Sequence, residues 1–466
     1  MVAREADRSV PRYSLIRGVF FTSKELFPNA ALKKLILPLV IEQVLAITVG
    51  LADTMMVSSV GEAAVSGVSL VDMLNVLIIN IFSALATGGA VGGAQLLGAR
   101  KNDRACDASK QLYLVVTVIA LIISTLVMLF RAPLLRLLFG KVEPEVMAAC
   151  ITYLKISAYS YPALAVYNAG AALYRSFGKT STTMYISIAS NCINVVGNCI
   201  GVFVLKAGVA GVAWPSLIAR TFSAAAITVL CFSKKNPVSY CWQGLLRLEG
   251  KLQAKILRIA VPNGFESGVF QLIKVALSSV ISMFGTYQIA ANGVAQSFWS
   301  MAALVCVAMG PVFITVIGQC MGAGDTEAAE YYFHKLMKIT LVFAAAWNLF
   351  IFALTPVVLH FYTLEPQTKQ LVLWLVLIHN VFNTVAFPFA DPLGKGLRAC
   401  GDVGFTTGIS LFTTIGVRLV FSMLFAVVLK MGVIGIAFAM CLDWFMRGII
   451  FWFRFKQSKW KTLKVI

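Results

Sequence analysis

The sequence predicts an all-α polytopic membrane protein with twelve transmembrane helices, arranged as two six-helix bundles related by a parallel pseudo-twofold repeat. Three observations predict this class: the composition, the spacing of apolar blocks and an internal repeat. Of the 466 residues, 59% are hydrophobic and only 13% are charged, whereas a soluble domain carries about a quarter charged residues. The mean hydropathy is +0.84. This composition excludes an ordinary soluble protein.

Apolar blocks of about 20 residues or more recur along the whole chain. A helix of about 20 residues rises about 30 Å, which is the thickness of the hydrocarbon core of a bilayer. The twelve blocks are centred near residues 48, 82, 120, 160, 193, 220, 270, 303, 347, 380, 415 and 443. Each block therefore predicts one membrane-spanning helix.

The net charge of +19 is distributed unevenly between the connections. Both termini and the even-numbered connections hold most of the Lys and Arg residues outside the blocks, and the positive-inside rule places that side in the cytoplasm. We therefore expect a plasma-membrane protein with both termini cytoplasmic. Residues 1–34 form a basic N-terminal segment, and residues 456–466 form a basic tail that anionic headgroups attract. No nucleic-acid-binding module is predicted.

The second half of the chain repeats the first in order and at a nearly constant offset. In three pairs of segments the offset is 224 residues. These pairs are "PLVIE" with "PNGFE" (38–42 and 262–266), "AQLLGA" with "GQCMGA" (94–99 and 318–323) and "LKAGVAGVA" with "LKMGVIGIA" (205–213 and 429–437). An ordered series of matches at one offset indicates duplication of a six-helix unit.

The repeat divides the chain into an N-lobe at residues 35–232 and a C-lobe at residues 256–455, joined by a polar cytoplasmic linker at residues 233–255. Six spans is an even number, so both copies insert the same way up and the pseudo-twofold axis lies along the membrane normal. Two such bundles leave a cleft between them, which is where transporters of this general design bind substrate. The architecture predicts a transporter.

Several segments resemble the multidrug and toxic compound extrusion (MATE) transporters. They include "ADTMMVSSVGEAAVSGVS", "GGAQLLGARKNDRA", "LRACGDVGF", "LKAGVAGVAWPS" and "DWFMRGIIFWFRF". The resemblance covers roughly residues 30–456. It implies a twelve-helix antiporter that exports organic, often cationic, compounds in exchange for Na+ or H+. It also implies a protein that is not an enzyme and needs no cofactor besides the coupling ion, and we expect a monomer.

Two carboxylates interrupt the first apolar block, at Glu42 and Asp53. Eleven residues correspond to about 1100° of helix, so both side chains lie on one face and about 16 Å apart. A carboxylate at mid-bilayer costs about 3 kcal/mol, which predicts a polar cavity or a partner for each. The resemblance implies that Asp53 couples cation entry to export. A salt bridge to another helix is the structural alternative, and Glu42 at the helix end has solvent as a third.

The fifth block contains Asn191, Asn194 and Asn198, which lie on one helix face at spacings of three and four residues. Amides at such positions also bond membrane helices to one another. The family places an Asn and an Asp where this chain has Asn194 and Asn198, and these complete a cation site with the Asp of the first helix. With Asn at 198, the predicted coupling-cation site is either an Na+ site of Asp53 and two amides, or Asp53 alone as a proton carrier.

The second half has no copy of this site. At an offset of 224, Asp53 corresponds to Leu277, Asn194 to Arg418 and Asn198 to Ser422. Polar residues kept only for packing would be expected in both halves. Their restriction to the first half therefore favours a dedicated role there.

Other polar residues are assigned to the substrate cleft or to ion pairs. The cleft assignment comprises Glu42, Gln43, Glu266 and Asn292, with Glu266 the repeat equivalent of Glu42. The structural ion pairs are expected among Asp391, Lys395, Arg418, Asp443 and Arg447, because the two Asp residues each have a basic residue four positions later.

The predicted mechanism is alternating access, in which a cation captured at Asp53 favours one arrangement of the lobes and displaces the organic substrate. A flippase for lipid-linked precursors or polysaccharides is the alternative function, and Lys274, Lys395 and Arg418 support it because such a cleft would be cationic. An enzyme is not predicted, because the sequence has no metal-ligand constellation, nucleophile elbow or phosphate loop. A channel or uniporter would lack counter-ion coupling.

Overall fold

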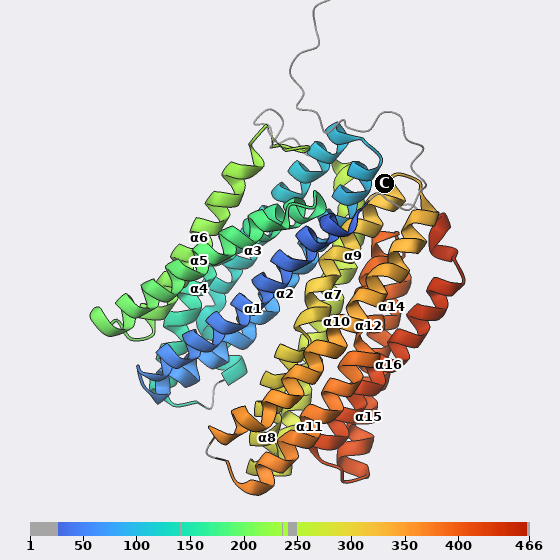
Figure 1. The fold of residues 1–466 in the computed structure, drawn as a ribbon. Helices are drawn as coiled ribbons and strands as arrows, with labels where there is room; N and C mark the ends of the chain where they lie inside the picture. Colours follow the sequence, from blue (N-terminus) through green and yellow to red (C-terminus); the bar gives the residue numbers. More distant parts are fainter. Residues whose placement is uncertain (1–26, 140–141, 235, 241–248, 363, 464–466) are drawn as a thin grey trace, which may run out of the picture.

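The computed structural model describes residues 27–139, 142–234, 236–240, 249–362 and 364–463. The described residues form helices joined by short connections and contain no strand, which confirms the all-α prediction. Figure 1 shows two helical lobes, the first coloured blue to green and the second yellow to red. Residues 1–26 of the predicted N-terminal segment, residues 235 and 241–248 of the predicted linker, and residues 464–466 of the tail lie outside the described part.

The N-lobe contains six long helices. They are α1 (Asn29–Ser58), α2 (Glu62–Gly98), α3 (Asn102–Phe139), α4 (Pro144–Ser176), α5 (Thr180–Cys199), which continues as the π-helix η1 (Ile200–Val204), and α6 (Ala210–Cys231). α4 packs against α2, α3 and α6, and α5 packs against α1 and α6.

The C-lobe has the same succession with more interruptions. It comprises α7 (Gly250–Ile281), η2 (Ser282–Phe284), α8 (Thr286–Ala302), α9 (Leu304–Gly322), α10 (Thr326–His360), α11 (Pro366–Val385), α12 (Phe387–Ala390), α13 (Pro392–Ala399), α14 (Val403–Phe412), η3 (Thr413–Leu419), α15 (Val420–Met423), η4 (Leu424–Val428), α16 (Val433–Lys456) and η5 (Lys459–Thr462).

Ten helices in the described residues are long and apolar enough to cross a membrane, and an eleventh span is the pair Pro366–Val385 and Phe387–Ala399, which bends by 54°. The remaining predicted span is α4. Its polar side chains at Tyr153, Ser157, Ser160 and Tyr161 are buried inside the lobe, so α4 is too polar by composition although it presents little of that polarity to lipid. The twelve predicted blocks thus correspond to twelve helical rods.

Small residues allow the lobes to approach each other closely, which is how helices pack where lipid is as apolar as the side chains. A Cβ atom added to Gly88 of α2 would lie 2.9 Å from the Cβ of Ala260 on α7, and one added to Gly318 of α9 would lie 2.8 Å from the Cβ of Ala94. The lobes therefore contact each other through α2, α7 and α9.

The repeated Gln and Gly residues meet at the pseudo-twofold axis. Gln95 donates to the carbonyl of Ala399 and Gln319 donates to the carbonyl of Ser176, both at 2.7 Å. A Cβ atom on Gly98 would clash with the Gln319 carbonyl, and one on Gly322 would clash with the Gln95 carbonyl. This reciprocal contact, which we call the interlobe clasp, closes the two lobes at the end where α2 and α9 finish.

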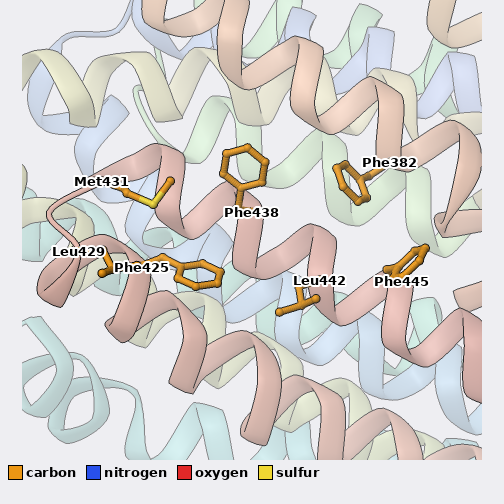
Figure 2. A pocket seen from close by; sticks show the side chains of 7 residues that line it. All are labelled: Phe382, Phe425, Leu429, Met431, Phe438, Leu442 and Phe445. Atoms are coloured by element: carbon orange, nitrogen blue, oxygen red, sulfur yellow. The ribbon is translucent and has the colours of Figure 1, made fainter.

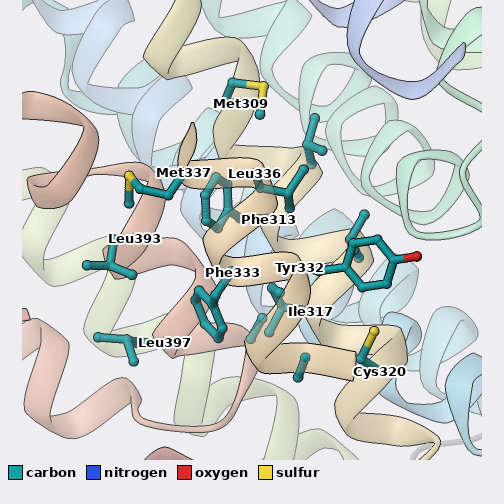
Figure 3. Packing of buried hydrophobic residues seen from close by; sticks show 14 of the residues in the cluster. Met309, Phe313, Ile317, Cys320, Tyr332, Phe333, Leu336, Met337, Leu393 and Leu397 are labelled. Atoms are coloured by element: carbon teal, nitrogen blue, oxygen red, sulfur yellow. The ribbon is translucent and has the colours of Figure 1, made fainter. Parts of the chain in front are cut away.

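The largest apolar core lies in the C-lobe and includes the start of α1. Figure 3 shows its centre, where Phe313 of α9 and Phe333 of α10 face Leu393 and Leu397 of α13. The first turns of α1 add Leu32, Leu35 and Leu39 to this cluster. α1 therefore belongs to the N-lobe by sequence but is packed into the core of the C-lobe over its first half.

Candidate functional site

Asp53 lies in a polar cluster inside the N-lobe. Asn198 donates its side-chain amide to Oδ1 of Asp53 at 2.7 Å, and the same amide lies 3.3 Å from Oδ1 of Asn194. Asn194 in turn donates to the Ser216 hydroxyl at 3.0 Å. The structure thus brings together the three residues of the predicted coupling-cation site, although their binding of a cation stays a prediction.

Close packing of α5 on α6 positions the two asparagines. A Cβ atom on Gly197 would lie 2.7 Å from the Cβ of Pro215, and one on Gly211 would lie 2.6 Å from the carbonyl oxygen of Gly201. These glycines let the backbones of α5, η1 and α6 touch. Asn194 and Asn198, which lie between α1 and α6, are therefore buried.

Asp53 is partly buried and is not neutralised by a basic partner. The described residues place no Lys, Arg or His nitrogen within 4.0 Å of its carboxylate. Asn198 Oδ1 is buried and has no hydrogen-bond donor. A carboxylate and a free amide oxygen side by side are suitable groups for a bound Na+, or for a proton on Asp53 shared with the amide oxygen.

The cluster contains a second carboxylate, Asp72 of α2, which the sequence analysis did not identify. Asn75 donates to Asp72 at 3.0 Å, and the Tyr161 hydroxyl donates to Oδ1 of Asn75 at 2.8 Å. Asp72 and Arg220 both act electrostatically on Asp53. The signal was an acidic residue inside the second apolar block, the same signal that identified Asp53.

Arg220 of α6 supplies the positive charge of the cluster. Its Nη1 donates to the Ser160 hydroxyl at 2.7 Å. No carboxylate in the described residues lies within 4.0 Å of this guanidinium. With Asp53, Asp72 and Arg220 all ionised, the cluster would carry one more negative than positive charge, so one monovalent cation would balance it.

Glu42 and Glu266 occupy equivalent ion pairs in the two lobes. Arg175 Nη2 lies 2.6 Å from Glu42, and Arg398 Nη2 lies 2.5 Å from Glu266. The two pairs correspond at the offset of the repeat. The two glutamates therefore have the ion-pair partner that the structural interpretation of Glu42 expected, and their place in a substrate cleft stays a prediction.

The predicted ion pairs of the C-lobe are present. Lys395 lies 2.8 Å from Asp391, and Arg447 Nη2 lies 2.6 Å from Asp443. Asp443 also faces Arg418, with 3.1 Å between Oδ2 and Nε.

A cavity of about 590 Å³ lies between the lobes, beyond the contacts of α2 with α7. Its walls are α2, the end of α3 and α7, and its lining residues are Ser69, Asp72, Met73, Leu74, Val76, Leu77, Leu138, Phe139, Gln271, Leu272, Lys274, Val275 and Ser278. Asp72 therefore links the N-lobe cluster to the interlobe cavity. Gln43 and Asn292 are partly buried, and neither lines this cavity.

A second hollow is a groove on the outside of the C-lobe. Figure 2 shows the seven apolar side chains that line it, contributed by α11, η4, α16 and the connection that follows η4. Its volume is about 650 Å³. Binding sites for specific ligands combine an apolar lining with a few polar groups that fix orientation. This groove lacks such groups and is suited to lipid tails rather than to an oriented substrate.

Comparison with known proteins gives consistent relatives over nearly the whole chain. The protein is 26% identical over 454 residues to the "Uncharacterized transporter YisQ" of Bacillus subtilis, covering 93% of this chain and 98% of that protein. It is 23% identical to the "Probable multidrug resistance protein NorM" of Thermotoga maritima, with 98% of both chains covered. A crystal structure of MATE in complex with MaL6 has the same fold, with a TM-score of 0.86, 20% identity and 92% and 96% of the two chains covered.

The sequence model of the MatE family matches the chain twice, at residues 38–200 and 262–424. These two matches are again 224 residues apart and together cover more than half of the chain. Members of this family are transporters and not enzymes. The chain, with its two clasped lobes and its buried carboxylates, therefore belongs to the MatE family of multi-pass membrane transporters.

Proposed function

We propose that the protein is a secondary active exporter of drug-like organic compounds, which crosses the plasma membrane with both termini cytoplasmic and exchanges its substrate for Na+ or H+. The observation that carries this proposal is the Asp53 carboxylate, held by Asn198 at 2.7 Å and without a basic partner in the described residues. Support comes from relatives that are named multidrug resistance proteins. We also propose that one chain is the working unit, since each lobe contributes a wall of the cavity.

The coupling requires that the cation binds one arrangement of the lobes more tightly than the other, because a cation with equal affinity for both shifts nothing. α1 is the element suited to this task. Its second half carries Asp53 against α5, while its first half packs in the core of the C-lobe. Neutralisation of Asp53 would change how the second half is held and would act on the contact between the lobes.

The interlobe clasp defines the step that export must include. The clasp closes the lobes at the end where α2 and α9 finish, and the cavity lies on the other side of the α2–α7 contact. For substrate to cross, the bonds of Gln95 and Gln319 must break and the cavity side must close. A cation that binds when the clasp is formed and leaves when it opens would drive export.

The choice between Na+ and H+ rests on Asn198. Na+ prefers several oxygen ligands, and Asp53 with the free amide oxygen of Asn198 gives fewer charges than a site with two carboxylates. A proton needs only Asp53 and an acceptor. The flippase alternative has no observation in its favour among the relatives, whose names indicate multidrug resistance or a transporter without assigned substrate.

The test is ethidium efflux from everted vesicles under an imposed Na+ or pH gradient. We expect gradient-driven efflux from the wild-type protein and a fall to the level of vesicles without the protein in Asp53→Asn, because this change removes the charge while keeping the shape. Asp103→Asn, at an exposed position in the first turn of α3, is the matched control and should transport normally. Unchanged coupled efflux in Asp53→Asn would show that coupling does not use this site.

A further inference from the structure

Lys274 of α7 is a positive charge on the wall of the interlobe cavity. No carboxylate in the described residues lies within 4.0 Å of its ammonium group, and the charged group that acts on it is another cation, Arg418. A lone lysine in a membrane-spanning helix is costly, so it is normally paired or faces an aqueous path or a ligand. The cavity is therefore the place where Lys274 must find its counter-charge.

Arg418 of η3 strengthens the positive potential behind Lys274. Its guanidinium lies 4.8 Å from the ring of Phe270, which is one helical turn from Lys274 on the same face of α7. Only 3% of Arg418 is exposed, and its Nε and Nη2 make no hydrogen bond. Asp443 compensates one charge, but Arg447 shares that carboxylate.

The positive group in the C-lobe is the repeat equivalent of the negative group in the N-lobe. Arg418 occupies the place of Asn194, which lies beside Asp53. With all groups ionised, Lys274, Arg418, Arg447 and Asp443 carry two more positive than negative charges, whereas Asp53, Asp72 and Arg220 carry one more negative charge. The cavity thus has Asp72 on its α2 wall and Lys274 on its α7 wall, and the two do not form an ion pair.

We propose that Lys274, supported by Arg418, is a subsite that binds an anionic group of the transported compound, so that carboxylate-bearing organic molecules are substrates. The inference rests on the proposed function as an exporter, and it adds the chemical class of one substrate group. Lys274 reaches the ligand in the cavity, and the free donors of Arg418 keep the surrounding potential positive. A carboxylate is a suitable partner for an ammonium group within an otherwise apolar lining.

The test uses two dyes that differ only in this group. Rhodamine 110 has a free carboxylate, and rhodamine 123 is its methyl ester. Binding to the purified full chain is measured by fluorescence polarisation, independently of transport. We expect Lys274→Gln to weaken binding of rhodamine 110 about tenfold, to leave rhodamine 123 within about twofold, and Lys274→Arg to retain rhodamine 110 binding. Lys338→Gln, at an exposed position of α10, is the control.

Two outcomes overturn the inference: rhodamine 110 does not bind the wild-type protein, or Lys274→Gln weakens both dyes equally, as expected for a purely structural lysine. Efflux of both dyes from vesicles is measured in parallel and tests the proposed function separately. Carboxylate-dependent binding without efflux would support the subsite while contradicting export. Efflux of rhodamine 123 with no effect of Lys274→Gln on rhodamine 110 binding would support export and remove the subsite.

Discussion

At the residue scale, the buried charges of this chain differ in whether they have an opposite charge beside them. Glu42 and Glu266 each contact an arginine of their own lobe, whereas Asp53 contacts an amide. An ion pair fixes a side chain, because breaking it leaves an unpaired charge in an apolar environment. A carboxylate that must accept and release a cation requires a partner without net charge. The amide of Asn198 is such a partner.

This difference predicts that Glu42 matters for stability. Glu42→Gln would leave Arg175 unpaired, and since the side chain of Arg175 is 23% exposed we expect a loss of about 3 kcal/mol, the lower end for a buried pair. The measurement is thermal unfolding of the purified protein in detergent. The double variant Glu42→Gln with Arg175→Gln should regain part of the loss.

The control for this prediction is Glu330→Gln. Glu330 pairs with Lys461 near the C-terminus, and both side chains are about a third exposed or more, so its removal should cost less than about 1 kcal/mol. Equal losses in Glu42→Gln and Glu330→Gln would contradict the assignment of a structural pair inside the N-lobe.

At the element scale, the repeated glycines at the ends of α2 and α9 set how closely the lobes meet. Neither Gly98 nor Gly322 has an unusual backbone conformation, so each is required by the opposing carbonyl and not by its own φ angle. Gly98→Ala should force the two helices apart and destabilise the clasped arrangement by about 1–3 kcal/mol. We expect a longer and broader distance between spin labels placed in the loops after α2 and α9.

The control is Gly268→Ala in α7, where an added Cβ atom meets nothing within 4 Å. It should leave the spin-label distance unchanged. A wild-type distance in Gly98→Ala would mean that the clasp yields without opening, and the close contact would then not restrict the lobes.

The sequence predicted the number and order of the spans, because apolar blocks and a repeat are properties of the chain itself. It did not predict where helices break, as at the 54° bend between α11 and α12, because such a bend depends on the packing of neighbouring helices. The asparagines of α5 could be placed beside Asp53 only through the family resemblance. Arg398 was expected near Asp391 by spacing, yet it pairs with Glu266 of another helix, and partners across helices are not readable from spacing.

At the scale of the whole molecule, transport requires two lobes that separate at one end and approach at the other. Ala94 and Gly318 lie at the clasp, with 2.8 Å between the Cβ of Ala94 and a Cβ added to Gly318. The Cβ atoms of a disulfide are about 3.8 Å apart, so a shift of about 1 Å would allow one. Ala94→Cys with Gly318→Cys should therefore form a cross-link on oxidation that abolishes efflux, and reduction should restore it.

Each single cysteine variant, treated with the same oxidant, is the control, because the described native cysteines are all free thiols. Efflux that continues in the fully cross-linked protein would exclude opening of the clasp as a step of transport.

The placement of α1 also constrains how the protein can be made. Leu32, Leu35 and Leu39 emerge from the ribosome among the first residues, yet their neighbours on α9 and α10 are synthesised more than 250 residues later. The beginning of the chain must therefore wait in the bilayer, with its final contacts missing, until most of translation is complete. Although the gene arose from a duplicated unit, its first half has lost the independence of the ancestor and can complete its assembly only when the second half arrives.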